Sequence, residues 1–237
     1  MEGNQFFLTQ VIQRYDNRLQ RAAGYFFTDL YLNGLDKEFI FAVLGAFETN
    51  AFDAAEFEPF SIEMIVDYIQ RTHTFYLQKK LPELEQSILL LSEAYNANHP
   101  LLAALNNLFR RYCKELAIHI REEEDKLLPY IVLLRNAERT PKHFSAFILT
   151  GQKYSLAQFL AEHHDTEDEL AQIRNTIRIY NPPPTNLSLY RILLTQLQTF
   201  EEDLRVHALM EEKVLIPKAL KIERKLIERL EQSPPFS

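Results

Sequence analysis

One pattern occurs twice in this chain and decides its fold: His119-Ile-Arg-Glu-Glu-Glu-Asp-Lys-Leu-Leu-Pro129 and His207-Ala-Leu-Met-Glu-Glu-Lys-Val-Leu-Ile-Pro217, both of the form H-x3-E-E-x2-L-[L/I]-P. The likeness continues upstream, where apolar residues spaced by three and four form one face of an amphipathic helix. These residues are Leu105, Phe109, Tyr112 and Leu116 before His119, and Leu193, Leu197, Phe200 and Leu204 before His207. The repeat predicts two long helices, each with a histidine and a glutamate on its buried face.

The two glutamates, Glu123 and Glu211, need a positive partner, because an unpaired buried carboxylate costs several kcal/mol. Each stands four residues after its histidine, so the two side chains lie on the same side of the helix. Two metal ions would supply the missing charge. The spacing differs from the Glu-x-x-His of ferritin-like proteins and the His-Glu-x-x-His of zinc proteases, neither of which occurs in the sequence.

The rest of the chain is also helical in character, with 46% hydrophobic residues and five glycines among 237 residues. Periodicity predicts four long helices, at about residues 61–96, 100–136, 152–180 and 186 to beyond 217, bent near Pro82 and Pro217. Short connections make neighbouring helices antiparallel. We therefore expect an all-α protein: residues 1–57 form an N-terminal helical extension of unknown role, and residues 58–237 an up-down-up-down four-helix bundle.

Charge and cysteine content exclude several classes of protein. A net charge of -7 and a pI near 5.6 disfavour nucleic acid, whose phosphates need a basic face. The single Cys113 rules out an internal disulfide and a four-cysteine metal site. The sequence shows no run long enough to span a membrane and no secretory charge pattern at its start, so we expect a cytoplasmic protein. No feature specifies or excludes a homodimer.

Each predicted helix carries a histidine near its middle: His73, His119, His163 or His164, and His207. In an up-down bundle these positions meet at one level. Four imidazoles and two carboxylates suit a dinuclear site in which each ion takes two histidines and the glutamates bridge. Nitrogen and oxygen donors without thiolate favour two iron ions, with manganese or zinc as alternatives. Such a shell leaves room for an oxo or hydroxo bridge and a diatomic ligand.

Residues 60–222 resemble the hemerythrin-like, HHE cation-binding family, and within it are most similar to the di-iron proteins that repair iron centres. The segments that carry the resemblance are Leu81-Pro-Glu-Leu84, His119-x3-Glu123, Glu162-His-His-Asp165, Pro182-Pro-Pro184 and His207-x3-Glu211. The resemblance implies a four-helix bundle around a non-haem di-iron centre. It assigns His119, His164 and His207 as ligands, with Glu123 and Glu211 as bridges.

The sequence departs from the repair proteins in two respects. Those proteins usually carry a Cys-Cys pair in their N-terminal segment, whereas residues 1–57 contain no cysteine. The resemblance also places the ligand of the first helix at Thr74. The spacing of the apolar residues instead places His73 on the inward face of this helix and Thr74 on the outward face, and we favour His73. In the third helix the resemblance favours His164, whereas the spacing of the apolar residues favours His163; we choose His164.

The function expected from these features is that of a di-iron protein that binds oxygen or nitric oxide, or handles iron, in oxidative or nitrosative stress, including repair of iron centres. A non-enzymatic sensor or carrier, and a helical interaction scaffold with a degenerate metal site, are the alternatives. The sequence does not decide whether the protein is an enzyme.

Overall fold

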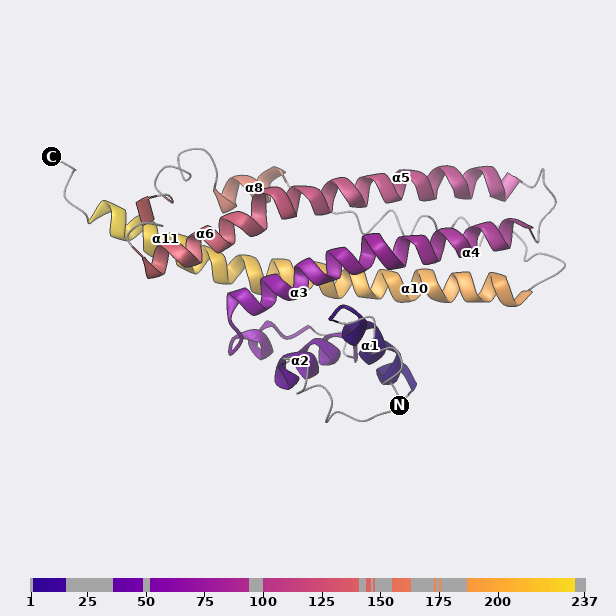
Figure 1. Cartoon of the computed structure of the whole chain (residues 1–237), viewed down its shortest axis with the longest axis horizontal. Helices are drawn as coiled ribbons and strands as arrows, with labels where there is room; N and C mark the ends of the chain where they lie inside the picture. Colours follow the sequence, from indigo (N-terminus) through magenta and orange to yellow (C-terminus); the bar gives the residue numbers. More distant parts are fainter. Residues whose placement is uncertain are drawn as a thin grey trace.

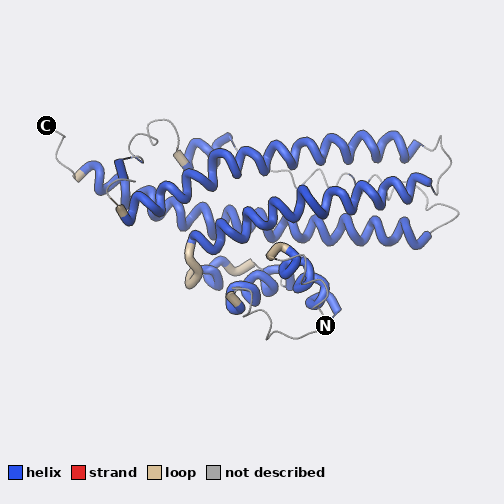
Figure 2. The backbone as a smooth tube through the Cα atoms, viewed as in Figure 1, coloured by secondary structure: helices blue, strands red, loops and turns tan. Residues whose placement is uncertain are grey.

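The computed structural model of the chain describes residues 2–15, 36–48, 52–93, 100–140, 144–145, 147, 155–162, 173, 175 and 187–232. Every regular element in this part of the chain is helical, and none is a strand (Figure 2). This confirms the all-α class.

Three long helical arms form the body of the described structure, and each consists of two α-helices joined by a π-helical turn. We call them arms A, B and D, after the first, second and fourth predicted helices. Arm A comprises α3 (Ile62–Phe75), η4 (Tyr76–Lys80) and α4 (Leu81–Glu93); arm B comprises α5 (Pro100–Glu122), η5 (Glu123–Leu127) and α6 (Leu128–Arg139); arm D comprises α10 (Leu187–Met210), η6 (Glu211–Leu215) and α11 (Ile216–Glu231).

The arms lie side by side along the long axis of the molecule (Figure 1). Arm B runs opposite to arm A, and arm D runs in the same direction as arm B. Helix α4 packs on α10 and α5, and α6 packs on α11. Of the predicted third helix, the structure describes residues 155–162, which include α8 (Leu156–Glu162), and residues 173 and 175; the remainder lies outside the described residues.

The π turns are explained by the three prolines of the sequence pattern. Pro82, Pro129 and Pro217 each stand two residues after a π turn ends. A proline lacks the amide hydrogen of a normal helical bond, and its ring clashes with the carbonyl four residues earlier. The amide of the preceding residue therefore reaches back five residues, for example from Leu128 to the carbonyl of Glu123. The bends expected at Pro82 and Pro217 are these wider turns.

Arm A begins where the sequence predicts. Ser61 caps the first turn of α3, because its hydroxyl accepts a hydrogen bond of 3.2 Å from the amide of Met64. The cap is preceded by a short 3-10 helix, η3 (Ala54–Phe57), whose own N-cap is Asp53.

The N-terminal part of the described chain contains α1 (Glu2–Gln13) and α2 (Lys37–Glu48), which pack on each other. Figure 1 shows them beneath arm A and arm D. Apolar residues of both helices are buried in one cluster with residues of the arms. The ring of Phe39, for example, lies edge-on to Tyr68 of α3, with centroids 5.5 Å apart. The extension thus shares an apolar core with the half of the body that contains α3, α6 and α11.

No helix in the described residues is both long and apolar enough to cross a membrane.

Candidate metal centre

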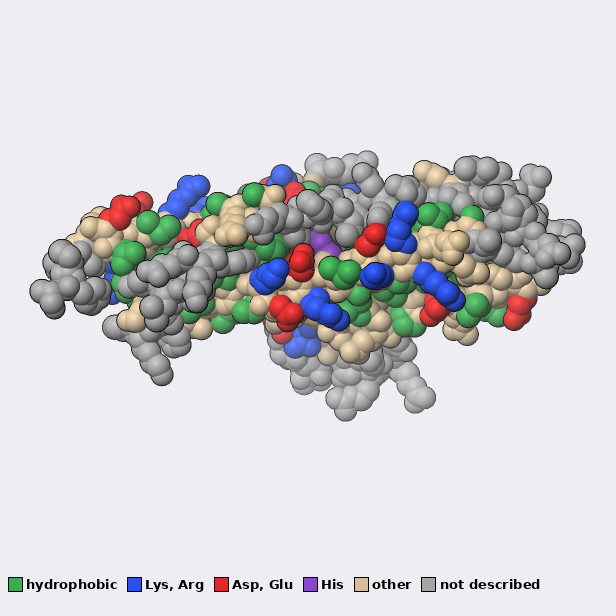
Figure 3. Space-filling model, turned by 90° about the horizontal axis from the view of Figure 1, so that it is seen from above, with side chains coloured by type: hydrophobic (Ala, Val, Ile, Leu, Met, Phe, Trp, Pro, Cys, Tyr) green, Lys and Arg blue, Asp and Glu red, His purple; other side chains and the backbone are tan. Residues whose placement is uncertain are grey.

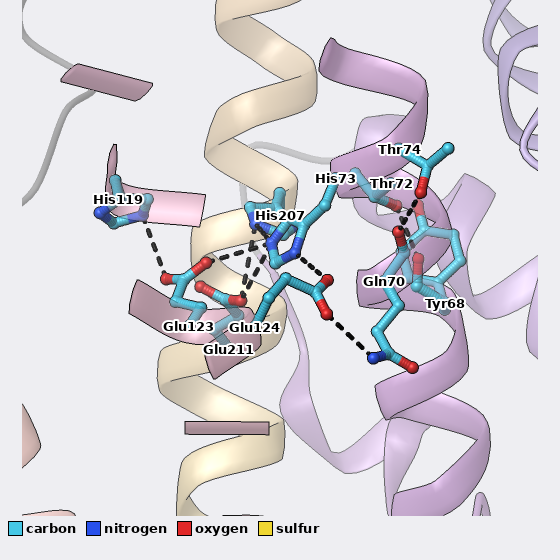
Figure 4. A network of polar contacts seen from close by, with 10 residues as sticks. All are labelled: Tyr68, Gln70, Thr72, His73, Thr74, His119, Glu123, Glu124, His207 and Glu211. Carbon is cyan, nitrogen blue, oxygen red and sulfur yellow. Dashed lines mark hydrogen bonds and ion pairs between the residues drawn. The ribbon is translucent and has the colours of Figure 1, made fainter. Parts of the chain in front are cut away.

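Five predicted ligands come together at the level of the π turns (Figure 4). His73 lies near the end of α3, His119 near the end of α5 and His207 near the end of α10. Glu123 and Glu211 are the first residues of η5 and η6. A π turn changes the direction in which the following side chains point, and such turns are frequent at functional sites. Here η5 and η6 each start at an inward-facing carboxylate, whereas η4 starts at Tyr76.

Four of these residues form a compact group. One ligand atom from each of His73, Glu123, His207 and Glu211 lies within 4.8 Å of all the others. The Nε2 atoms of His73 and His207 face each other at 3.2 Å. Glu211 Oε1 lies 3.5 Å from His207 Nε2 and 3.9 Å from His73 Nε2.

His119 approaches from the opposite side of Glu123 (Figure 4). Its Nε2 lies 3.1 Å from Glu123 Oε1, while the other oxygen, Oε2, lies 3.1 Å from His73 Nε2. The two oxygens of one carboxylate thus face histidines on different arms. A carboxylate that bridges two metal ions needs this arrangement.

The cluster is buried, and the negative charges of its two carboxylates repel each other unless a cation offsets them. Glu123 is 0% and Glu211 4% exposed. Burial, followed by the negative charge of Glu123, raises the pKa of Glu211 well above its usual value. Burial, followed by the neighbouring His73, lowers the pKa of His207 well below the usual value. His207 is therefore held in the neutral form that can bind a metal.

The donor set fits metal ions. Two buried carboxylates stand beside imidazole nitrogens, and within the described structure the Oε1 atom of buried Glu211 has no hydrogen-bond donor. A divalent cation would give this oxygen a partner and relieve the repulsion between the two glutamates. Nitrogen and oxygen donors without thiolate suit iron, manganese or zinc.

A further carboxylate fixes the orientation of His73. Glu124 Oε1 lies 2.7 Å from His73 Nδ1, and Gln70 Nε2 donates to Glu124 Oε2 at 3.0 Å. Burial acts to lower the pKa of His73, but the hydrogen bonds to Glu123 and Glu124 outweigh it and raise the pKa. Holding Nδ1 in this way leaves Nε2 directed at the cluster, as in many metal-bound histidines.

The structure also places the residues between which the sequence left a choice. His73 is 2% exposed and belongs to the cluster, whereas Thr74 is exposed and its hydroxyl donates to the Gln70 carbonyl at 3.1 Å. His163 and His164 lie outside the described residues. The sequence reasoning missed Glu124 and Gln70; Glu124 was nevertheless visible as the second glutamate of the H-x3-E-E pattern.

A cavity of about 150 Å³ adjoins the cluster. Its lining includes His119, His207 and Glu211, together with the apolar residues Leu116, Ile120, Leu127, Phe159 and Leu204. An apolar cavity of about this volume can hold a molecule the size of benzene, so a diatomic molecule has ample room. Figure 3 shows a histidine side chain at the surface near the middle of the molecule on this face.

A family match covers the part of the chain that contains His119, Glu123, His207 and Glu211, and it begins after His73. Residues 77–219 match the hemerythrin HHE cation binding domain. The chain is similar to the iron-sulfur cluster repair protein ScdA of Staphylococcus haemolyticus, with 23% identity over 154 residues, which are 65% of each protein. It is also similar to ScdA of Staphylococcus epidermidis, with 22% identity over 158 residues, 67% of this chain and 66% of that protein. The chain thus spans slightly less than two thirds of these relatives.

Proposed function

The chain belongs to the hemerythrin HHE cation-binding domain family, and we propose that it holds two iron ions in a four-helix bundle that residues 152–180 complete. The observation that carries the proposal is the buried group of two carboxylates and two facing imidazoles. His73 and His207, on arms A and D, would hold one ion. His119 and a histidine of the third predicted helix, His164 in our choice, would hold the other.

The two glutamates have distinct places in this arrangement. Glu123 would bridge, because its oxygens face His119 and His73 separately. Glu211 would be the second bridge, and its nearer histidine is His207. When bound, an iron pair supplies reversible one-electron chemistry and open coordination positions for a small ligand. The protein's own part would be to hold His207 neutral, to orient His73 through Glu124 and to keep an apolar cavity beside the centre.

We propose further that the cavity admits oxygen or nitric oxide and that the protein acts in the maintenance of iron centres during oxidative or nitrosative stress. The cavity is too small for a large substrate and has mostly apolar walls, which suits an uncharged diatomic molecule. Similarity to proteins named for iron-sulfur cluster repair supports the second half of this proposal.

Elemental analysis of protein purified without chelators tests the metal centre directly. We expect close to two irons per chain and, in the oxidised form, charge-transfer absorption from a bridged ferric pair. Nitric oxide added anaerobically to the ferrous protein should produce new visible absorption in proportion to the amount added. Absence of metal after anaerobic loading with ferrous iron would refute the proposal. Zinc or manganese at two per chain would keep the site but refute the iron assignment.

A sensor or carrier role is the second candidate, and one contact favours it. Arg205, two residues before His207, donates to the carbonyl of Ala46 in α2 at 3.1 Å. A shift of arm D at the metal centre would therefore reach the N-terminal extension. Amide hydrogen exchange of α1 and α2 with and without nitric oxide tests this role. Altered exchange together with reversible binding and no turnover supports a sensor, whereas unchanged exchange argues against one.

A further inference from the structure

The N-terminal extension contributes one charged side chain to the interior behind the metal centre. Arg14 directly follows α1 and is completely buried, with 0% of its side chain exposed. Its guanidinium donates hydrogen bonds to the carboxylate of Asp203 and to the hydroxyl of Tyr68. It also lies over the rings of Tyr68 and Phe75, at 5.1 and 5.4 Å from the centroids. A residue outside the metal-binding arms is thus the buried counter-charge of Asp203.

Asp203 connects this arginine to the cluster. It precedes His207 by one helical turn on α10, and it accepts a hydrogen bond of 2.9 Å from the hydroxyl of Tyr76. The ring of Tyr76 in turn lies edge-on to the ring of His207, with centroids 5.6 Å apart. Arg14, Asp203 and Tyr76 therefore form a continuous buried polar network that ends at His207, a proposed metal ligand.

The position of Tyr76 in the sequence repeat explains why this polar network exists. Tyr76 stands six residues before Pro82, and Glu123 and Glu211 stand six residues before their prolines. All three are first residues of a π turn. On arm A a phenol occupies the place of a bridging carboxylate, and its hydroxyl is turned to Asp203. Buried at 1% exposure, Asp203 then needs a cation of its own.

We propose that Arg14 is a positioning residue for the metal centre: by holding Asp203 and, through it, Tyr76, it fixes the ring of His207 in its metal-binding orientation. The proposal rests on the metal-binding function above and deepens it, since the N-terminal extension becomes part of the site. Removing an outer-shell hydrogen-bond partner of a metal ligand typically changes metal affinity by about 10–100-fold, and Tyr76 constrains His207 through a ring contact in the same shell. We expect at least a tenfold effect here.

The test measures cobalt(II) binding by the full-length apo-protein, using the visible absorption of the bound ion, together with unfolding in urea. Arg14→Met leaves Asp203 buried without a counter-charge, so both stability and affinity should fall. The triple variant R14M/Y76F/D203L replaces this polar network with apolar side chains of similar size and removes both charges of the Arg14–Asp203 pair. We expect it to unfold near the wild-type urea concentration, yet to bind cobalt(II) at least tenfold more weakly with a changed spectrum.

Arg71→Met is the matched control. Arg71 also contacts the extension, over the ring of Tyr15 at 4.9 Å, but its ion pair is with the exposed Asp67. This variant should bind cobalt(II) like the wild type. If the triple variant is stable and binds with wild-type affinity and spectrum, Arg14 only packs and the inference is wrong. If the wild type itself binds no metal, the proposed function fails and this inference with it.

Discussion

The buried pair of glutamates makes an unusual prediction: replacing Glu211 by glutamine should stabilise the metal-free protein while weakening metal binding. At 4.8 Å, the largest separation within the cluster, two like charges repel by about 3 kcal/mol at an effective dielectric constant of about 20. Glu211 relieves part of this repulsion by retaining a proton, which its raised pKa permits. The expected gain in the free energy of unfolding at pH 7 is therefore about 1–3 kcal/mol.

The pH dependence has a definite sign. Because the pKa of Glu211 is raised in the folded protein, the unfolded chain releases this proton first as the pH rises above about 4.5. Wild-type stability relative to E211Q therefore falls between pH 4.5 and the raised folded-state pKa. Below pH 4.5 the carboxyl is protonated in both states, and the difference between the two proteins should disappear.

Urea unfolding of chelator-treated protein at several pH values measures this difference. Glu212→Gln is the matched control, because this adjacent carboxylate is exposed and lies beside Lys213; we expect a change within about 0.5 kcal/mol. With metal present the order should reverse: free metal at about 100 times its dissociation constant adds about 2.7 kcal/mol to the wild type, and less to E211Q. A metal-free E211Q that is less stable than the wild type, or one that binds metal normally, would refute the reasoning.

Three further predictions follow from individual contacts. His73→Ala should abolish binding of about one metal ion per chain, whereas Thr74→Ala should leave metal content unchanged; metal analysis of both variants decides the register of the first ligand. Glu124→Gln should weaken metal binding about tenfold without lowering apo-protein stability by more than about 1 kcal/mol, as measured by metal titration and urea unfolding. Tyr130→Phe removes a 2.7 Å hydrogen bond to buried Glu223 and should cost about 1–3 kcal/mol in urea unfolding, with metal content unaffected.

Much of the architecture could be read from the sequence because it depends on local chemistry. The three-and-four spacing of apolar residues fixes which face of each helix is buried, and Ser61 marks the start of α3 by capping it. The inward position of His73 follows from the same spacing, without any knowledge of its neighbours. A proline after each inward glutamate or tyrosine forces a wider turn by loss of one amide hydrogen, although the π-helical form of that turn was not foreseen.

Tertiary structure decided which contacts the matching residues of the two nearly identical motifs make. Glu124 and Glu212 occupy the same place in the repeat, yet Glu124 binds His73 at 2.7 Å while Glu212 is exposed beside Lys213. The difference arises because Glu124 faces arm A and its histidine, a contact between arms that neither local sequence encodes. For the same reason the pairing of Arg14 with Asp203 could not be foreseen, since the two residues meet only when the extension packs on arm D. The sequence by itself determined the buried face of each arm, with His73, Glu123 and Glu211 on it. The packing of the arms and the extension determined which buried groups meet, because charge partners far apart in the chain are brought together only by the tertiary fold.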